Sequence, residues 1–288
     1  MRWQDGRRGE VDDRRGSGGG GMGAPHFIGG GGIGVVIIAL IGYFVFHIDP
    51  AQLLSTVDTP VATDSPNTAP ASGTGACADE ACQFVNVIHT SADDTWAATF
   101  AASGKTWRAS KLVVYSEQTP TGCGEGQAAM GPFYCPADES VYIDLDFFKT
   151  LDQQLGAPGD FAKAYVVAHE VGHHVQNLLG ISDQVQRQSQ HLGPKAANAL
   201  SVKLELQADC YAGVWAKQAN AKMNWIEAGD IDEAMGAATA VGDDTLQKEM
   251  QGRVVPDSFT HGTSAARTKW FKTGFESGQP SDCNTFKS

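Results

Sequence analysis

The chain has 288 residues, of which 21 are Lys or Arg and 33 are Asp or Glu, so its formal net charge at pH 7 is −12. An acidic chain without a basic stripe repels phosphate backbones, and no nucleic-acid partner is expected. The first quarter differs so strongly in composition from the rest that only the rest is expected to bury a core, as one domain of catalytic size.

The N-terminal part of the sequence predicts a tail and a membrane anchor. Residues 1–26 mix Arg, Asp and a run of Gly, which predicts a disordered cytoplasmic tail. Residues 27–48 lack Lys, Arg, Asp and Glu and are long enough to cross a membrane as one helix. Five arginines precede this stretch and no Lys or Arg follows it until Lys105, so the positive-inside rule places the N-terminus in the cytoplasm and the rest of the chain outside. A cleaved signal peptide is the alternative, but the stretch begins late and no small-x-small site follows it.

Residues 49–76 are rich in Thr, Pro, Ala, Ser and Gly, a linker composition, and the folded domain is expected over residues 77–288. An even number of cysteines suits an oxidising compartment, where all of them can pair. Proximity along the chain favours two short-range pairs, the first two and the middle two cysteines, and leaves the last two for each other. The six are Cys77, Cys82, Cys123, Cys135, Cys210 and Cys283.

Two β-prone runs, residues 111–116 and 140–148, predict a small sheet. In the second run Val141 and Ile143 alternate with Tyr142 and Asp144, as in a strand with one buried and one solvated face.

Four helices are predicted after the sheet, because apolar residues recur there at helical spacing. The third is expected to begin at Asp230, with Glu233 completing a capping box. Their expected ranges are 160–179, 194–220, 231–241 and 264–276.

The chemistry-bearing motif is His169-Glu170-Val171-Gly172-His173, within the first of these helices. Two histidines four residues apart lie on one helical face and can both reach one Zn²⁺. Glu170 can then stand beside the metal and accept a proton from a metal-activated water. A solvated helix face is the alternative, but apolar neighbours surround the motif, and burying it without a metal would be costly.

A third ligand is expected from the next helix, where Glu205 and Asp209 are four residues apart and therefore on one face. Two His and one Glu leave a coordination position open, as in a catalytic zinc site. Asp209 suits a supporting role, accepting a hydrogen bond from the second ring nitrogen of a liganding histidine, His169 for preference.

Several separated motifs together resemble the bacterial neutral zinc metallopeptidase family of membrane-anchored proteins. They are GPFYCP, VYIDLDFF, HEVGHHVQNLLG, ELQADCYAG, HGTSAAR and the terminal Cys-x-Thr-Phe. The resemblance implies an α+β domain of the zincin type, within the gluzincin arrangement, in which a small sheet packs on the active-site helix. It also implies His169, His173 and Glu205 as zinc ligands and Glu170 as catalytic base.

Gluzincins use a further donor to stabilise the negatively charged oxygen of the tetrahedral intermediate. His261, just ahead of the last predicted helix, is the first candidate; Tyr165 and Arg267 are alternatives. A loop histidine that only caps local backbone would look the same in sequence.

These features predict zinc-dependent hydrolysis of peptide bonds at the outer face of a bacterial inner membrane, with residues 27–48 as the single anchor and the catalytic domain periplasmic or extracellular. The substrates expected are peptides or proteins. Two alternatives are a zinc-binding adaptor or assembly factor of the cell envelope without catalysis, and a soluble secreted protease. No residue pattern selects a particular substrate or an oligomeric state.

Overall fold

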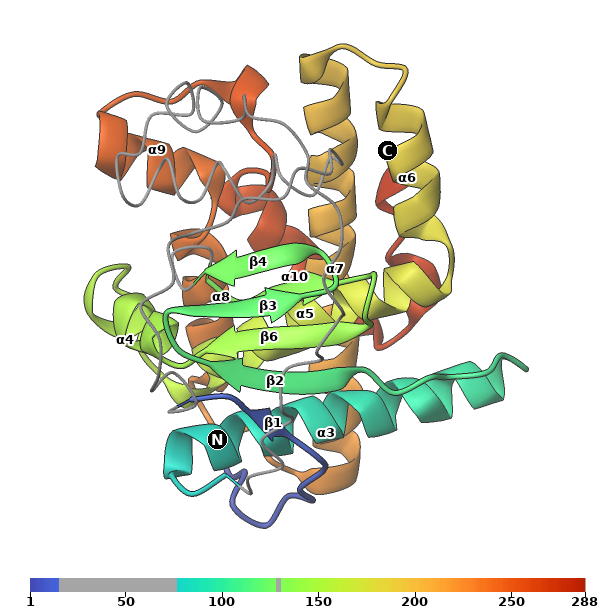
Figure 1. Ribbon diagram of the computed structural model, residues 1–288, viewed down its shortest axis with the longest axis vertical. Helices are drawn as coiled ribbons and strands as arrows, with labels where there is room; N and C mark the ends of the chain where they lie inside the picture. The colour runs from blue at the N-terminus through green and yellow to red at the C-terminus, as the bar shows by residue number, and fades with distance from the viewer. Residues whose placement is uncertain (16–76, 128–130, 288) are drawn as a thin grey trace, which may run out of the picture.

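The computed structural model describes residues 1–15, 77–127 and 131–287, in which a small sheet lies against a set of helices (Figure 1). The four-stranded sheet has the order β1-β2-β6-β5. Its first three strands are parallel, and β5 is antiparallel to β6. A separate antiparallel hairpin is formed by β3 and β4. The strands are β1 (Asp12–Asp13), β2 (Lys111–Tyr115), β3 (Gln118–Thr121), β4 (Gly124–Gln127), β5 (Phe133–Cys135) and β6 (Ser140–Asp144).

Both faces of the sheet are covered. Alternate residues of β2 and β6, among them Val114 and Ile143, join the main helical core. The opposite face carries a second apolar cluster in which Tyr142 stacks on Phe133, with ring centroids 4.8 Å apart. The half-buried strand expected from the alternating pattern is therefore wrong, because all five residues of β6 are buried.

The α+β class expected from the sequence is confirmed, and so are the four predicted helices, whose ends differ from the predicted ones by at most three residues. Within the described residues there are four further α-helices that were not expected, α3, α4, α6 and α9. The α-helices of the described residues are α3 (Glu80–Ala102), α4 (Asp146–Gln153), α5 (Asp160–Leu178), α6 (Ile181–Ser189), α7 (Pro194–Met223), α8 (Asp230–Ala240), α9 (Asp243–Gln251) and α10 (Ser264–Ser277).

Helices α7 and α10 approach each other so closely that only glycine fits at their crossing. A Cβ atom built on Gly274 would lie 1.9 Å from the carbonyl oxygen of Cys210, and one built on Gly213 would lie 2.1 Å from that of Phe271. The C-terminus is also tied to α7, because Cys210 and Cys283 form a disulfide. The other two disulfides join Cys77 to Cys82 and Cys123 to Cys135, so the three predicted pairings are confirmed.

The first 15 residues pack on the domain, so the disordered tail predicted for residues 1–26 is wrong over this part. Trp3 is buried against Phe84 of α3, and β1 extends the sheet. Apolar side chains and a strand pairing hold these residues on the domain, although the overall composition of the segment gave no sign of this packing.

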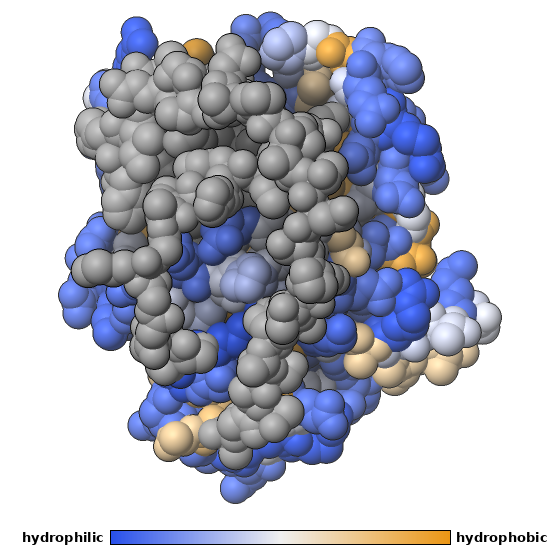
Figure 2. Space-filling model, viewed as in Figure 1, coloured by the Kyte–Doolittle hydropathy of each residue, from blue (hydrophilic) through white to orange (hydrophobic). Residues whose placement is uncertain are grey.

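The predicted anchor (27–48) and linker (49–76) lie outside the described residues. Within the described part of the chain, no helix is both long and apolar enough to cross a membrane. On the face drawn in Figure 2 the described surface is mainly hydrophilic, with hydrophobic residues as separate spots.

Candidate metal centre

Helix α5 carries the His-Glu-x-x-His motif, and a glycine flanks the helix at each end. Gly159 precedes the helix with a φ of 123°, a conformation that favours glycine, and Gly180 follows it in the left-handed region at 70°. The first turn is capped from another helix, because the carboxylate of Glu233 accepts a hydrogen bond from the backbone N–H of Phe161 at 3.0 Å. The capping box predicted for Glu233 within its own helix is therefore wrong.

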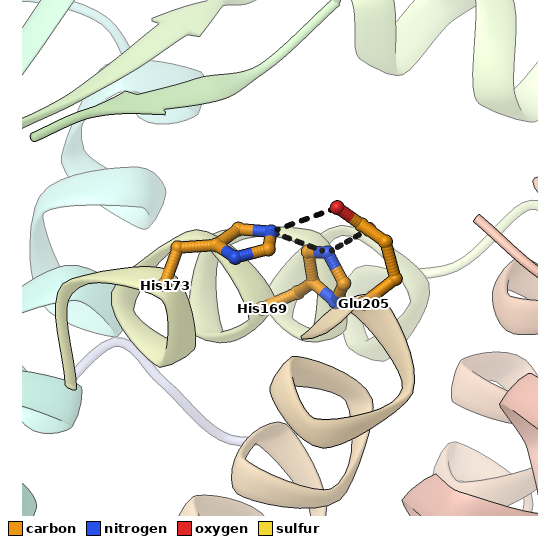
Figure 3. Close-up of side chains that lie close together, drawn as sticks. All are labelled: His169, His173 and Glu205. Atoms are coloured by element: carbon orange, nitrogen blue, oxygen red, sulfur yellow. Dashed lines mark hydrogen bonds and ion pairs between the residues drawn. The ribbon is translucent and has the colours of Figure 1, made fainter. Parts of the chain in front are cut away.

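A close contact between α5 and α7 brings the predicted ligands together. A Cβ atom on Gly172 would lie 3.1 Å from the carbonyl oxygen of Ala208, so a larger side chain would push the two helices apart. Figure 3 shows His169 and His173 side by side on α5, with Glu205 reaching them from α7. The glycine inside the motif thus matters for the distance between the ligands.

The three side chains meet at the spacing that a zinc ion requires. The two Nε2 atoms of His169 and His173 are 3.2 Å apart, and the Glu205 carboxylate lies 3.2 Å from the first and 3.5 Å from the second. Zinc bonds of about 2.0–2.2 Å at tetrahedral angles place donor atoms roughly 3.3 Å apart. Among the described residues, this is the group of His, Cys, Asp or Glu side chains able to hold a metal ion.

The hydrogen bonds behind the histidines leave their Nε2 atoms free to bind a metal. His169 donates from Nδ1 to Asp209 at 2.9 Å. His173 donates from Nδ1 to the side-chain oxygen Oε1 of Gln176 at 2.9 Å, and Gln176 is held in turn because its side-chain Nε2 donates to the backbone oxygen of Leu204 at 2.7 Å. With both Nδ1 atoms protonated, two ring lone pairs and a carboxylate converge. That donor set repels itself unless a cation occupies the centre, so the residues fit Zn²⁺.

Asp209 is the hub of a buried ionic network under the ligands. Its carboxylate is fully buried and also accepts from Tyr165 Oη at 2.5 Å and from Arg267 Nε and Nη2 at 2.9 and 2.8 Å. Burial would raise the pKa of Asp209, but the charges of Arg267 and His169 outweigh it and lower this pKa to about 2. Asp209 is therefore ionised, as an acceptor for His169 must be.

The same network acts on the ligands. Burial would lower the pKa of His169, but the charge and hydrogen bond of Asp209, assisted by Glu205, raise it to about 10. Burial would raise the pKa of Glu205, but His173 and His169 lower it. A cation in the centre would take over the role of the His169 proton, because a histidine ligand must be neutral to bind.

Glu170, next to the ligands on α5, is only 8 % exposed. Burial raises the pKa of its carboxyl, although the nearby His173 and His169 partly oppose the shift. A carboxylate with a raised pKa beside a metal site is suited to accept a proton and to return it.

His261 lies near enough to Glu205 for each side chain to affect the pKa of the other. Asp243, at the start of α9, holds the loop: its carboxylate accepts from the backbone N–H groups of Thr260, His261 and Gly262 at 2.7–2.8 Å. It also lies 3.2 Å from His261 Nδ1. Burial would lower the pKa of His261, but Asp243 and Glu205 outweigh it and raise it. These contacts favour the protonated form of the His261 ring, which is positively charged and can donate a hydrogen bond.

The two alternative donors are occupied elsewhere. Arg267 is 4 % exposed and pairs with Asp209 and with Tyr165 Oη at 3.2 Å. Tyr165 is 1 % exposed and donates to the same carboxylate. Both therefore support Asp209.

Sequence reasoning missed two residues of this arrangement, Gln176 and Asp243. Gln176 follows His173 by three residues on α5, so helical spacing alone would have placed it on the same face. Asp243 had no such signal, because only the tertiary fold brings α9 beside residues 260–262.

Comparisons with known proteins agree with this description. Residues 1–286 match the model of a family described as "Putative neutral zinc metallopeptidase". The chain is 49% identical over 294 residues, 99% of each chain, to the uncharacterized protein YpfJ of Escherichia coli K12. It is 46% identical over 185 residues, 61% of each chain, to the uncharacterized protein Rv2575 of Mycobacterium tuberculosis H37Rv. No solved structure matches the chain. From a match over nearly its whole length, the chain belongs to the neutral zinc metallopeptidase family.

Proposed function

We propose that this protein is a zinc-dependent peptidase that hydrolyses peptide bonds with water. The observation that carries the proposal is the meeting of His169, His173 and Glu205 at metal spacing, with Glu170 buried beside them. These three side chains would hold Zn²⁺, which supplies a Lewis acid for the substrate carbonyl and lowers the pKa of water. Such a site is open, because three protein ligands leave one position of a tetrahedron for water or substrate.

The residues of the chain have separate tasks in this reaction. Glu170 takes the proton from the attacking water and delivers it to the leaving amine. His261, held by Asp243, donates to the oxygen of the former carbonyl as that oxygen becomes negative. Asp209 keeps the ring of His169 in its orientation. The placement of these groups on α5 and, further along the chain, on α7 supports the zincin type and the gluzincin arrangement.

Substrate recognition in this proposal uses the sheet. Among the described strands, β5 lies at an edge of the four-stranded sheet, and it packs on α5. An extended peptide can pair with such an edge as an additional strand, which would lay its backbone along the active-site helix.

The domain is proposed to work outside the cytoplasm. Three disulfides support this location, because such bonds persist in oxidising compartments and are rare in the cytosol. The proposal includes association with the membrane through residues 27–48 and makes no statement about the side on which residues 1–15 lie.

The experiment compares the purified full-length protein with Glu170→Gln in two measurements, zinc content by elemental analysis and cleavage of a mixed peptide library by mass spectrometry. Glu80→Gln, an exposed position at the start of α3, is the matched control. Glu170→Gln should keep its zinc and lose cleavage, whereas Glu80→Gln should keep both. Cleavage that survives Glu170→Gln would overturn the mechanism, and zinc binding by the wild type without any cleavage would favour the adaptor alternative.

A further inference from the structure

The first 15 residues, here called the N-terminal segment, fit their place on the domain closely. A Cβ atom on Gly6 would lie 2.3 Å from Val87 Cγ1, and one on Gly9 would lie 2.6 Å from Thr90 Oγ1. Gly9 also exchanges two hydrogen bonds with the Asn86 side chain, at 2.7 and 3.0 Å. The two glycines permit a close approach, and the Asn86 side chain forms the pair of hydrogen bonds that a neighbouring strand would form. Both features indicate a dedicated docking site on α3.

The far end of the segment joins the sheet. Asp12 and Asp13 pair in parallel with Val113 and Val114, and the backbone N–H of Arg14 donates to Val114 O at 2.7 Å. At the opposite end Arg2 N donates to the carbonyl oxygen of Trp225, the residue that also contacts Gly6. The segment is therefore held along its whole length.

The arginines of the segment have partners within the folded domain or the segment itself. Arg7 makes a two-pronged pair with Asp94 at 2.6 and 3.1 Å. Arg14 donates to Thr119 Oγ1 and Pro120 O, each at 2.9 Å, and Arg15 pairs with Asp79 at 2.7 Å. Under the positive-inside rule these arginines indicate a cytoplasmic N-terminus, but their contacts in the docked segment account for them equally well.

Residues 15 and 77 lie at one place on the domain. Arg15 reaches Asp79, and the Asp13 carboxylate is 3.8 Å from Cys82 Sγ, beside the first disulfide. A chain that crossed a membrane once between residues 15 and 77 would put these groups on opposite sides of a hydrocarbon core about 30 Å thick. Contacts of 2.7 Å cannot form across that distance.

We propose that the N-terminal segment and the metallopeptidase domain lie on the same side of the membrane, docked to each other within one chain. Neither the single-pass anchor nor the cleaved signal peptide meets this condition, because the first separates residues 1–15 from the domain and the second removes them.

The first test reads the side of the membrane directly in cells that produce the full-length chain. Asp5→Cys and Gln186→Cys place thiols at exposed positions of the segment and of α6, respectively. Intact spheroplasts are treated with a membrane-impermeant maleimide, and a second sample is permeabilised first. Equal labelling of the two variants in both samples is expected. Labelling of one variant before permeabilisation and of the other only afterwards would overturn the proposal.

The second test reads the docking itself in purified full-length protein. The Cβ atom built on Gly9 lies 3.7 Å from Thr90 Cβ, within the range of about 3.5–4.5 Å for disulfides. Oxidised Gly9→Cys/Thr90→Cys should yield a linked peptide pair spanning positions 9 and 90, while each single variant should not. A folded, zinc-binding double variant without that pair, or with the link only between two copies of the chain, would contradict docking within one chain.

Discussion

Replacing Asp209 by Asn tests the ionic network beneath the metal centre. The substitution keeps the size of the side chain but removes its charge and turns one accepting oxygen into a donor. Asp209 accepts hydrogen bonds from His169, Tyr165 and Arg267, and it is fully buried. An amide at this position cannot accept from all of these donors, and it faces at least one of them with its own N–H group.

The size of the effect follows from the burial of Arg267. Its side chain is 4 % exposed, and Asp209 is the carboxylate that pairs with it at 2.8 Å. Breaking a buried ion pair by removing one partner costs about 3–5 kcal/mol, since the other charge stays buried without compensation. The loss of the acceptor for His169 should also weaken zinc binding by about 10–100-fold.

The assay is urea unfolding at pH 7 after removal of metal by a chelator, together with zinc titration against a competing chelator. Arg267→Met and the double variant complete a double-mutant cycle, in which the double should be far less destabilised than the sum of the singles. Asp257→Asn is the matched control, because its pair with Lys195 is exposed and worth at most about 1 kcal/mol. A cost for Asp209→Asn no larger than that of Asp257→Asn, or additive single effects, would refute the reasoning.

Three further predictions concern pH, packing and the proposed oxygen-stabilising donor. Burial raises the pKa of Asp93 to about 6, above its unfolded value near 4. As pH rises from 4 to 7, the free energy of unfolding of the wild type should therefore fall by about 2–3 kcal/mol relative to that of Asp93→Asn. Urea unfolding measures this change, and a difference between the two proteins that stays constant with pH would contradict it. Gly274→Ala should lower the free energy of unfolding by about 1–3 kcal/mol through overpacking. Gly236→Ala on α8, where an added Cβ meets nothing within 4 Å, should instead raise the free energy of unfolding by about 0.5–1 kcal/mol. Equal effects of the two substitutions on urea unfolding would disprove the close crossing of α7 and α10. His261→Ala should reduce kcat by a factor of about 10²–10³ with zinc content unchanged. Asp243→Asn should also lower kcat, because it removes the support of His261. An unchanged kcat of His261→Ala in a peptide-cleavage assay would remove His261 from the mechanism.

Local sequence was sufficient for the long helices that carry the ligands. Helix α5 was expected over residues 160–179 and occupies Asp160–Leu178, because its capping glycine and helical periodicity act within a few residues of the chain. Helix α3 was missed, although it is the platform for the N-terminal segment, and its residues are buried on most sides, so they show little periodic contrast.

Burial by distant parts of the chain overrode two local patterns. Tyr142 and Asp144 alternate with apolar residues in the strand β6, yet both are buried because packing covers the second face of the sheet. Residues 1–15 are rich in Arg, Asp and Gly, yet Trp3 and the β1 pairing anchor them. In each case the sequence reports polarity, whereas the partner surface decides exposure.

Helical spacing is a local property, so it was enough to show that His169 and His173 share one face and that Glu205 and Asp209 share another. That the two faces meet depends on the packing of the helices, through the contact of Gly172 with α7. The tertiary structure alone placed Arg267 under Asp209 and Asp243 behind His261, since electrostatic partners come from segments far apart in the chain. It likewise brought the N-terminal segment onto the domain, where contacts across 70 or more residues replace local preference.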